Sequence, residues 1–339
     1  MKDVPLYPSK LGHKAQNRLE SGGGRVDAVV IGSINVDLVV RVREMPGPGA
    51  TVLAESARHQ VGGKGANQAI AAARQGVRVR LIGALGTDAF APMLKDSLAH
   101  AGIDISGVAE VPGPSGTALI FLEPCGQNRI VVIPGANAAL SPESVERTLL
   151  ATEAPRETAV MLQNEIPRDA VMAAIRAAHL RGWRVVWNVA PPSEVPAGVL
   201  RRGDVIAMNE VEAAQVTGRE VSDERTAAEA AEAAEAMLAR GAGLTIVTLG
   251  PKGVVATSAR GTFHLPAWPV EVRDTTAAGD TWLGAFVAAW DGGEDVHEAL
   301  RYATAAASLC VSRMGAADSI PARREVEAFL RSRPQGKFV

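Results

Sequence analysis

The sequence predicts an α/β fold: a three-layer α/β/α sandwich with a mostly parallel central sheet, and a small β-sheet that projects from it. Short β-branched segments alternate with longer segments of helical periodicity almost to the end of the chain, which is typical of a parallel sheet covered by helices. In two places, strand-like segments follow each other without a helix long enough to connect parallel neighbours. Those strands must pair with one another, and they predict the second sheet.

The elements of the main sheet follow in order along the chain. Strands are predicted at 26–32, 77–83, 158–162, 184–188, 204–208 and 244–249. Helices are predicted at 65–75, 88–101, 141–151, 168–181, 209–217 and 223–240. A hairpin at 253–257 and 262–265 precedes three further helices at 278–291, 295–312 and 323–332. Ser141 and Pro142 supply a helix start, and Gly218 supplies a helix stop.

The projecting sheet is predicted from strands at 36–42, 51–54, 117–123 and 129–133, within the regions 36–61 and 115–134. We interpret this sheet as a lid over a binding site. Hairpins that merely decorate the main sheet are the alternative.

Composition and length agree with one globular domain. The 339 residues suit about two domains, or one α/β domain with a lid, and we expect a single domain over 26–332. Residues 1–25 are polar and lack the hydrophobic segment of a signal peptide, so a disordered tail is expected there, with a second tail at 333–339. Cys125 and Cys310 are too few for a disulfide framework, which favours a cytoplasmic protein.

Several classes of function are disfavoured. The formal net charge of −2 at pH 7 gives no electrostatic reason to expect nucleic acid or a membrane surface as a partner. No apolar run approaches the roughly 18 residues of a membrane span. The sequence has no G-x-x-x-x-G-K-[ST], no G-x-G-x-x-G after the first strand, no H-E-x-x-H and no G-x-S-x-G. P-loop, dinucleotide-binding, zinc and serine hydrolase sites are therefore not predicted.

The first polar motif follows the first predicted strand, as GSINVD at 32–37. Ligands bind where the strands of a parallel sheet end. If the segment continues as a strand, Asn35 and Asp37 lie on one face, and the carboxylate can accept two hydrogen bonds from a vicinal diol. An Asx-type turn is the alternative.

The second motif, GGKGANQA at 62–69, places a dense run of glycines just before a helix of small residues. Such a run allows the backbone to approach a ligand closely, while Lys64 and Asn67 add charge and hydrogen-bonding groups. The motif predicts a docking surface for a polar, oxygen-rich molecule. A simple turn is the alternative.

The third motif, DTTAAGDT at 274–281, places small residues where a helix starts. Free backbone amides and the positive end of the helix dipole form an anion hole there, suited to a transferring phosphoryl group. Asp280 lies in the first helical turn. A carboxylate beside an anion hole can accept the proton of an attacking hydroxyl, so we expect a general base at this position.

Together these residues resemble the ribokinase / phosphofructokinase-B family of carbohydrate kinases, and within it the ribokinases. The similarity runs from about residue 26 to 332 and includes seven motifs in the family's order. They are GSINVD at 32–37, GGKGANQA at 62–69, PGANAALSP at 134–142, QNEIP at 163–167, Asn209 with Glu212 as N-x-x-E, TLGPKG at 248–253 and DTTAAGD at 274–280. Any one motif is weak, but their common order is specific.

The resemblance implies ATP-dependent phosphorylation of the O5 hydroxyl of D-ribose, with Mg²⁺ as the metal. Asp280 would be the base, beside an anion hole formed by Ala277, Ala278, Gly279 and Asp280 itself. The implied sugar-binding residues are Asn35, Val36, Asp37, Gly63, Lys64, Gly65, Ala66, Asn67, Glu165 and Asp280. The implied nucleotide-binding residues are Asn209, Thr248, Leu249, Gly250, Pro251, Lys252, Gly253, Gly279, Asp280 and Thr304.

The resemblance also implies metal sites and a dimer. Glu212 would organise Mg²⁺ through water, since hard oxygen ligands suit that ion. An activating K⁺ would be held by Asp274, Thr276, Cys310, Arg313, Gly315 and Ser319. A homodimer would form through the lid sheet.

Two residues depart from the family's pattern. Thr304 stands where asparagine or histidine is usual near the nucleotide base, and Leu283 stands where asparagine is frequent. Neither departure removes a reacting group.

Two alternative functions remain, because a fold does not fix an activity. One is a related kinase for 2-deoxyribose, another sugar or a nucleoside, and the other is a non-catalytic sugar- or nucleotide-binding regulator.

Overall fold

The computed structural model describes residues 27–123, 128–219, 226–290, 292 and 296–333. The tail expected at 1–25 lies outside these residues, as does the C-terminal tail apart from residue 333. Within the described part, no helix is both long and apolar enough to cross a bilayer.

The central sheet has nine strands, which are β1 (Ala28–Ile31), β4 (Val79–Leu85), β5 (Asp104–Glu110), β8 (Ala159–Leu162), β9 (Arg184–Asn188), β10 (Val205–Asn209), β11 (Leu244–Thr248), β12 (Val254–Ser258) and β13 (Gly261–Leu265). Their order is β13-β12-β11-β10-β9-β8-β1-β4-β5. All neighbours from β5 to β11 are parallel, and β12 and β13 add an antiparallel edge. The predicted mostly parallel sheet and the C-terminal hairpin are confirmed.

Strand β5 was not predicted. It pairs with β4 along one side only and forms the edge of the sheet. Its sequence, DISGVAE, is half-buried and carries no strong apolar alternation, because an edge strand covered on one side needs fewer buried side chains.

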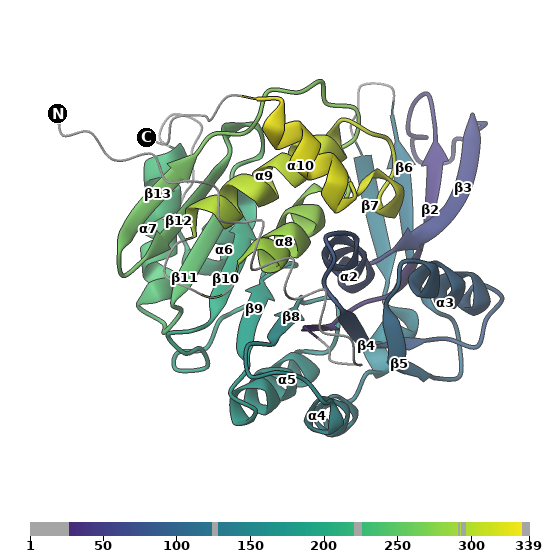
Figure 1. Cartoon of the computed structure of the whole chain (residues 1–339). Coiled ribbons are helices and arrows are strands. Elements are labelled where there is room, and N and C mark those ends of the chain that lie inside the picture. Colours follow the sequence, from purple (N-terminus) through teal and green to yellow (C-terminus); the bar gives the residue numbers. More distant parts are fainter. Residues whose placement is uncertain (1–26, 124–127, 220–225, 291, 293–295, 334–339) are drawn as a thin grey trace.

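Helices cover both faces of the sheet. One face packs against α2 (Lys64–Arg74), α3 (Ala91–His100), α8 (Ala278–Ala289), α9 (His297–Val311) and α10 (Arg323–Arg331), and the other against α4 (Pro142–Ala151), α5 (Arg168–Leu180), α6 (Glu210–Thr217) and α7 (Thr226–Leu238). Successive residues of β1 alternate between the two cores, with Ala28 and Val30 on one face and Val29 and Ile31 on the other. The α/β/α sandwich is confirmed (Figure 1).

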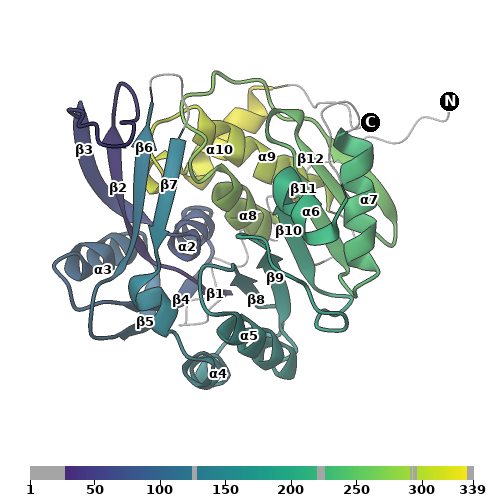
Figure 2. The same ribbon diagram turned by 180° about the vertical axis from the view of Figure 1, so that it is seen from behind.

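The lid is a separate sheet of four strands, β2 (Asn35–Arg41), β3 (Ser56–Gly62), β6 (Gly116–Leu122) and β7 (Asn128–Ile133), in the order β3-β2-β6-β7. It stands at one side of the molecule, far from the β12-β13 edge, in both views (Figures 1 and 2). The predicted strand at 51–54 is wrong. Those residues are not in a strand, Leu53 is 91% exposed, and β3 lies at 56–62 because β2 pairs with it from Asn35 opposite Gly62.

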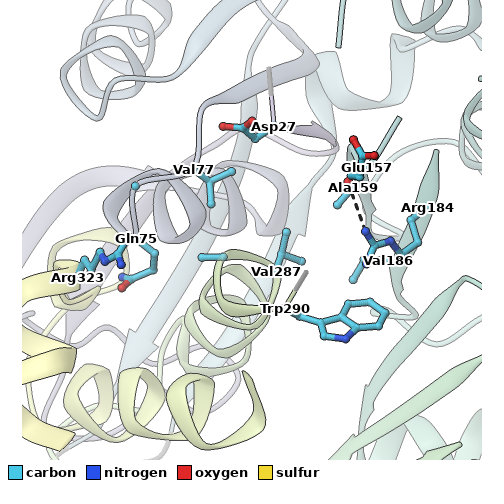
Figure 3. A pocket seen from close by; sticks show the side chains of 12 residues that line it. Asp27, Gln75, Val77, Glu157, Ala159, Arg184, Val186, Val287, Trp290 and Arg323 are labelled. Carbon is cyan, nitrogen blue, oxygen red and sulfur yellow. Dashed lines mark hydrogen bonds between the residues drawn. The ribbon is translucent and has the colours of Figure 1, made fainter. Parts of the chain in front are cut away.

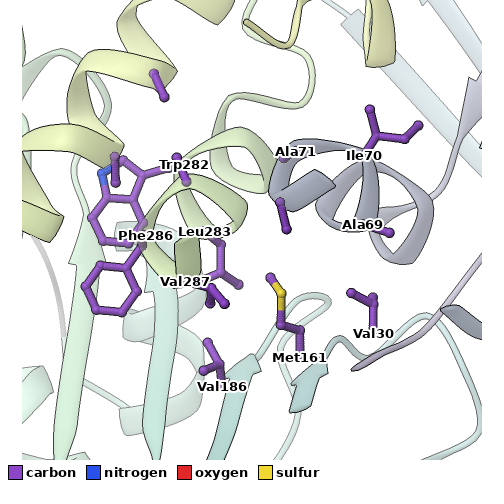
Figure 4. Packing of buried hydrophobic residues seen from close by; sticks show 14 of the residues in the cluster. Val30, Ala69, Ile70, Ala71, Met161, Val186, Trp282, Leu283, Phe286 and Val287 are labelled. Carbon is purple, nitrogen blue, oxygen red and sulfur yellow. The ribbon is translucent and has the colours of Figure 1, made fainter. Parts of the chain in front are cut away.

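Helices α2 and α8 lie unusually close, and this contact positions the site. A Cβ at Gly284 would fall 2.5 Å from the Cβ of Ala71 and 2.7 Å from the backbone nitrogen of Ala72. Small residues on both helices therefore allow the close approach, above a sheet face that includes Val30 and Met161 (Figure 4). The first turn of α8 is thereby held beside the first turns of α2.

Candidate active site

The polar motifs gather at one end of the sheet. The carboxyl ends of β1, β8, β9 and β10 lead into Asn35, Glu165, Asn188 and Asn209. A small cavity of about 50 Å³ lies at the opposite end, where Asp27, Glu157 and Arg184 precede or begin their strands (Figure 3). Because ligands of open α/β sheets bind at the carboxyl ends, the cluster of motifs, and not this cavity, is the candidate active site.

Asn35 and Asp37 both lie on β2, so the first motif continues as a strand and is not a turn. The two residues are 2% and 4% exposed. Residues two apart on a strand share a face, and these two therefore present an amide and a carboxylate side by side.

Asn137 orients Asn35, although no role was predicted for this residue within the 134–142 motif. It lies in the short helix η1 (Gly135–Ala139) and is 1% exposed. Its Oδ1 accepts from the backbone nitrogen of Ile34 at 2.9 Å, and its Nδ2 donates to Asn35 Oδ1 at 2.7 Å. Since that oxygen is engaged, Asn35 offers its NH₂ group to a ligand.

The Asp37 carboxylate is poised to accept hydrogen bonds. Its Oδ1 is buried and has no partner in the described structure. A Cβ at Gly62 would fall within 2.2 Å of this carboxyl group, so only glycine fits opposite it. Burial, followed by the charges of Glu165 and Asp280, raises the pKa of Asp37 to about 7.

Lys64 and Glu165 are brought together from α2 and the end of β8. Glu165 Oε2 accepts from Ser33 Oγ at 2.5 Å and from the Lys64 backbone nitrogen at 3.0 Å. Burial acts to lower the pKa of the Lys64 ammonium, but the carboxylates of Asp280, Glu165 and Glu212 outweigh it and raise the pKa. Lys64 therefore stays charged within a cluster of acids.

Asp280 lies in the first turn of α8 and is 7% exposed. Asn67 Nδ2 donates to its Oδ2 at 3.2 Å, and Gln68 Nε2 donates to its Oδ1 at 2.9 Å. Burial raises the pKa of this carboxyl group, while the charge of Lys64 opposes that effect. A raised pKa suits a carboxylate that has to accept a proton.

The turn before α8 leaves backbone amides free, as the predicted anion hole requires, with one difference. Ala277 is left-handed, with φ 59°, and a Cβ at Gly279 would meet no atom within 4 Å, so this backbone borders open space. Among the described residues, the amides of Ala277, Gly279 and Asp280 meet no backbone acceptor, whereas that of Ala278 donates to Thr275 O at 3.2 Å. Three of the four expected amides are thus available to an anion.

The expected nucleotide side follows β10 and β11. Asn209 and Glu212 form a capping box at the start of α6: Asn209 Oδ1 accepts from the Glu212 backbone at 2.7 Å, and Glu212 Oε2 accepts from the Asn209 backbone at 2.8 Å. Asn209 pairs in register with Thr248, which leads into the short helix η2 (Gly250–Lys252). Asn209 and the 248–253 segment therefore lie next to each other at the sheet end.

Thr304 is an exception among the expected nucleotide contacts. It is 5% exposed, and its Oγ1 accepts from Trp282 Nε1 at 3.1 Å and donates to Leu300 O at 2.8 Å. The Thr304 hydroxyl is thus engaged within the α8–α9 interface, and the nucleotide contact of this residue stays a prediction. Leu283, the second departure, is 2% exposed in the core beneath α8 (Figure 4).

The residues assigned to K⁺ surround one loop. Asp274 Oδ1 accepts from Thr276 N at 2.9 Å, and Asp274 Oδ2 accepts from Gly315 N at 2.9 Å. Cys310 Sγ lies 3.0 Å from Ser319 Oγ. The Arg313 guanidinium pairs with Glu325 at 2.7 Å. Because a guanidinium has no acceptor atom, only the backbone oxygen of Arg313 could face a cation. Within the described residues, no group of three His, Cys, Asp or Glu side chains is arranged to hold a metal ion.

With this geometry in place, comparison with known proteins identifies the family. The model described as "pfkB family carbohydrate kinase" matches residues 26–323. The chain belongs to this family. Among curated pfkB relatives, the ribokinase of Haemophilus influenzae is 36% identical over 90% of this chain and 99% of its own length. The deoxyribokinase of Salmonella typhi is 33% identical over 90% of this chain and 99% of its own length.

Solved structures agree with the pfkB assignment. The ribokinase of Thermotoga maritima has a TM-score of 0.79 and 36% identity, covering 90% of this chain and 99% of its own. The ribokinase of Arabidopsis thaliana, solved with ribose and ATP, has a TM-score of 0.77 and 31% identity, covering 91% of this chain and 99% of its own. The chain is thus a carbohydrate kinase of this family, and its fold matches these ribokinase structures.

Proposed function

We propose that this pfkB kinase transfers the γ-phosphoryl group of ATP to the O5 hydroxyl of D-ribose, giving D-ribose 5-phosphate and ADP. The observation that carries the proposal is the place of Asp280. Its buried carboxylate directly follows the free amides of Ala277 and Gly279 and accepts from Asn67, and its charge helps to raise the pKa of Asp37, which is proposed to bind the sugar. The curated ribokinase relative and the ribose-bound Arabidopsis structure support ribose as the acceptor.

The sugar would be held by groups from three elements. Asp37 accepts hydrogen bonds from a diol, since its Oδ1 is buried and without a partner in the described structure. Asn35 donates its NH₂ group, and Lys64, Asn67 and Glu165 close the pocket from α2 and the end of β8. Gly65 packs against the backbone of Gly32 and Ser33, where a Cβ would not fit, and so holds the start of α2 beside β2. Val36, Gly63 and Ala66 would complete the pocket.

Asp280 would act as the general base. The carboxylate takes the proton of the O5 hydroxyl as the bond from O5 to the phosphorus forms and the bond to ADP breaks. The amides of Ala277, Gly279 and Asp280 donate to the oxygens of the transferred group. Burial of Asp280 keeps water away from this proton transfer.

The chain's residues fit ATP and Mg²⁺. The open space over Gly279, which a Cβ would fill, suits a phosphoryl group, and Asn209 with the 248–253 segment suits the rest of the nucleotide. Bound ATP supplies the phosphoryl group, and Mg²⁺ screens its charge. Glu212 would orient the waters of the metal with Oε1, since its Oε2 is engaged by Asn209. Asp274, Ser319 and the backbone oxygens of Thr276, Cys310, Arg313 and Gly315 would hold K⁺.

A second candidate substrate is 2-deoxyribose, because a deoxyribokinase is also a close relative. The diol-binding role of Asp37 favours ribose, since a buried acceptor loses a partner when one hydroxyl is missing. A nucleoside kinase is less well supported, because the lid strands offer mainly aliphatic side chains and Phe121.

The test measures ADP release from MgATP with D-ribose, 2-deoxyribose, fructose and adenosine in parallel, each in Na⁺ and in K⁺. We expect the largest kcat/KM for D-ribose and a higher rate in K⁺. Faster turnover of another acceptor would overturn the sugar assignment, and equal rates in both salts would contradict the K⁺ site. Binding of ribose without ADP formation would support a regulator.

We also propose that the lid mediates a homodimer. The outer strand β7 exposes four consecutive apolar residues, Ile130, Val131, Val132 and Ile133, each at least 44% exposed. Such an edge is open to pairing with a second copy. Light scattering should give a dimer for the wild type and a monomer for Val131→Lys, and a wild-type monomer at micromolar concentration would contradict the proposal.

A further inference from the structure

Beside Asp280, the amide side chains of Gln163, Gln68 and Asn188 form a hydrogen-bonded chain that the catalytic scheme above does not use. Gln163, directly after β8, donates from Nε2 to Gln68 Oε1 at 2.6 Å. Gln68, on α2, donates from Nε2 to Asp280 Oδ1 at 2.9 Å and to Asn188 Oδ1 at 3.1 Å. Gln68 and Gln163 are both fully buried.

The direction of these hydrogen bonds is set by a backbone carbonyl. Asn188 Nδ2 donates to Ala207 O of β10 at 3.1 Å, and a carbonyl oxygen can only accept. Asn188 must therefore turn its oxygen toward Gln68. Gln68 must therefore donate to that oxygen from its NH₂ group, and the Gln68 oxygen then accepts from the NH₂ group of Gln163. The sheet thus fixes which end of the Gln68 amide faces Asp280.

Both hydrogens of the Gln68 NH₂ group are then used, one on Asn188 and one on Asp280. A proton on Asp280 Oδ1 would face a donor, and rotating the Gln68 amide would also break its bond to Asn188. The other oxygen, Oδ2, receives only the longer bond from Asn67, at 3.2 Å. The two oxygens of the carboxylate are therefore not equivalent.

We propose that Gln68 is a positioning residue that holds Asp280 Oδ1 as a permanent acceptor, so that Oδ2 takes the proton of the sugar hydroxyl. This inference rests on the proposed role of Asp280 as the base. The inference goes beyond that role in naming Oδ2 as the oxygen that reacts. The reason is that the hydrogen-bonded amide chain occupies Oδ1.

Other charged groups also act on Asp280, and a test has to separate them from Gln68. The charged or titratable groups that face Asp280 come from β2, α2, the end of β8, α6 and α9, and they are Asp37, Lys64, Glu165, Glu212 and Cys310. The substitution Gln68→Met leaves all of these charged groups in place. It removes the donor to Asp280, together with the hydrogen bonds of Gln68 to Asn188 and Gln163.

The experiment compares Gln68→Met with Gln75→Met. Gln75 follows the same helix as its C-cap and is 3% exposed. It makes two buried side-chain hydrogen bonds, donating to Pro321 O at 2.8 Å and accepting from the Tyr302 hydroxyl at 2.7 Å, against three for Gln68. It lies at the far end of α2 and has no contact with Asp280, so it controls for the loss of a buried amide.

The readout is the pH dependence of kcat. It reports the pKa values of groups in the enzyme–substrate complex, so the titration of Asp37 in the sugar-free enzyme does not contribute to it. Loss of one hydrogen bond to a charged group is expected to move the acid limb of Gln68→Met upward by about one pH unit, with kcat about tenfold lower than wild type along that limb. KM for the sugar should change less than about twofold. Gln75→Met should lose thermal stability but keep the wild-type limb. An unchanged limb in Gln68→Met, or equal shifts in both variants, would overturn the proposal.

A second measurement does not depend on turnover or on the folding of a variant. In the wild type with labelled Asp and Gln, the side-chain NH₂ resonances of Gln68 should move with pH together with the carboxyl carbon of Asp280. Gln68 resonances that do not follow Asp280 would overturn the proposal. Absence of turnover in the wild type would instead reject the proposed function. The NMR titration would then still test whether Gln68 donates to Asp280.

Discussion

Asp280→Asn is expected to lower kcat by about 10³-fold, within the range that general bases contribute. The substitution is nearly isosteric, so the first turn of α8 and the amides of Ala277 and Gly279 stay in place. Titration calorimetry should show nearly unchanged ATP binding. The fall in kcat would then be due to impaired proton transfer and not to weaker ATP binding.

A buried aspartate outside the site provides the control. Asp204 Oδ2 accepts from His179 Nε2 and from Arg201 N, both at 2.7 Å, at the opposite end of the sheet. Asp204→Asn should lower the melting temperature and leave kcat unchanged. If Asp280→Asn kept more than about a tenth of the wild-type rate, or if Asp204→Asn lost as much activity, Asp280 would not be the base.

Sugar binding is expected to strengthen as the pH rises from 6 to 8. The pKa of Asp37 is about 7, so the carboxyl group is mostly neutral at pH 6 and mostly ionised at pH 8. A diol donates to the ionised form, and the ribose Kd should therefore rise by up to about tenfold per pH unit below the pKa. By the same linkage, the sugar lowers the pKa of Asp37, and its binding near pH 7 releases a proton.

Asp37→Asn tests this prediction directly. The variant keeps the shape of the side chain but presents an NH₂ group to a diol, so ribose should bind about 10²-fold more weakly and without pH dependence between 6 and 8. Calorimetry in two buffers of different ionisation enthalpy measures both the Kd and the released proton. A wild-type Kd that is constant over this range, or an Asp37→Asn variant that retains the dependence, would assign the sugar contact elsewhere.

The local motifs were readable from the sequence because their chemistry is local. The alternation of β-branched and helical segments predicted the main sheet, and the absence of crossover helices predicted the lid. The motif DTTAAGDT by itself predicted an anion hole with a base beside it. Small residues at a helix start imply free amides, and Asp280 lies among them. The box between Asn209 and Glu212 is likewise formed by residues three apart.

The errors arose where partners, and not local pattern, decide the structure. Residues 51–54 look as β-branched as a strand, but β2 finds its partner at 56–62. Strand β5 pairs with β4 alone, at the edge of the sheet, and its sequence lacks the strong apolar alternation that would have predicted a strand.

The fold class and the family follow from the amino-acid sequence alone, because both depend on short runs of neighbouring residues, and one such run also predicts Asp280 as the reacting carboxylate. How those residues are tuned depends on packing between distant segments. The pKa of Asp37 depends on burial and on Glu165 and Asp280, which are far away in the chain. The orientation of Asp280 depends on a line of hydrogen bonds that begins at a carbonyl of β10 and passes through Asn188 and Gln68. Glutamine and asparagine have no periodic signature, so their partners become known only when strands and helices pack together.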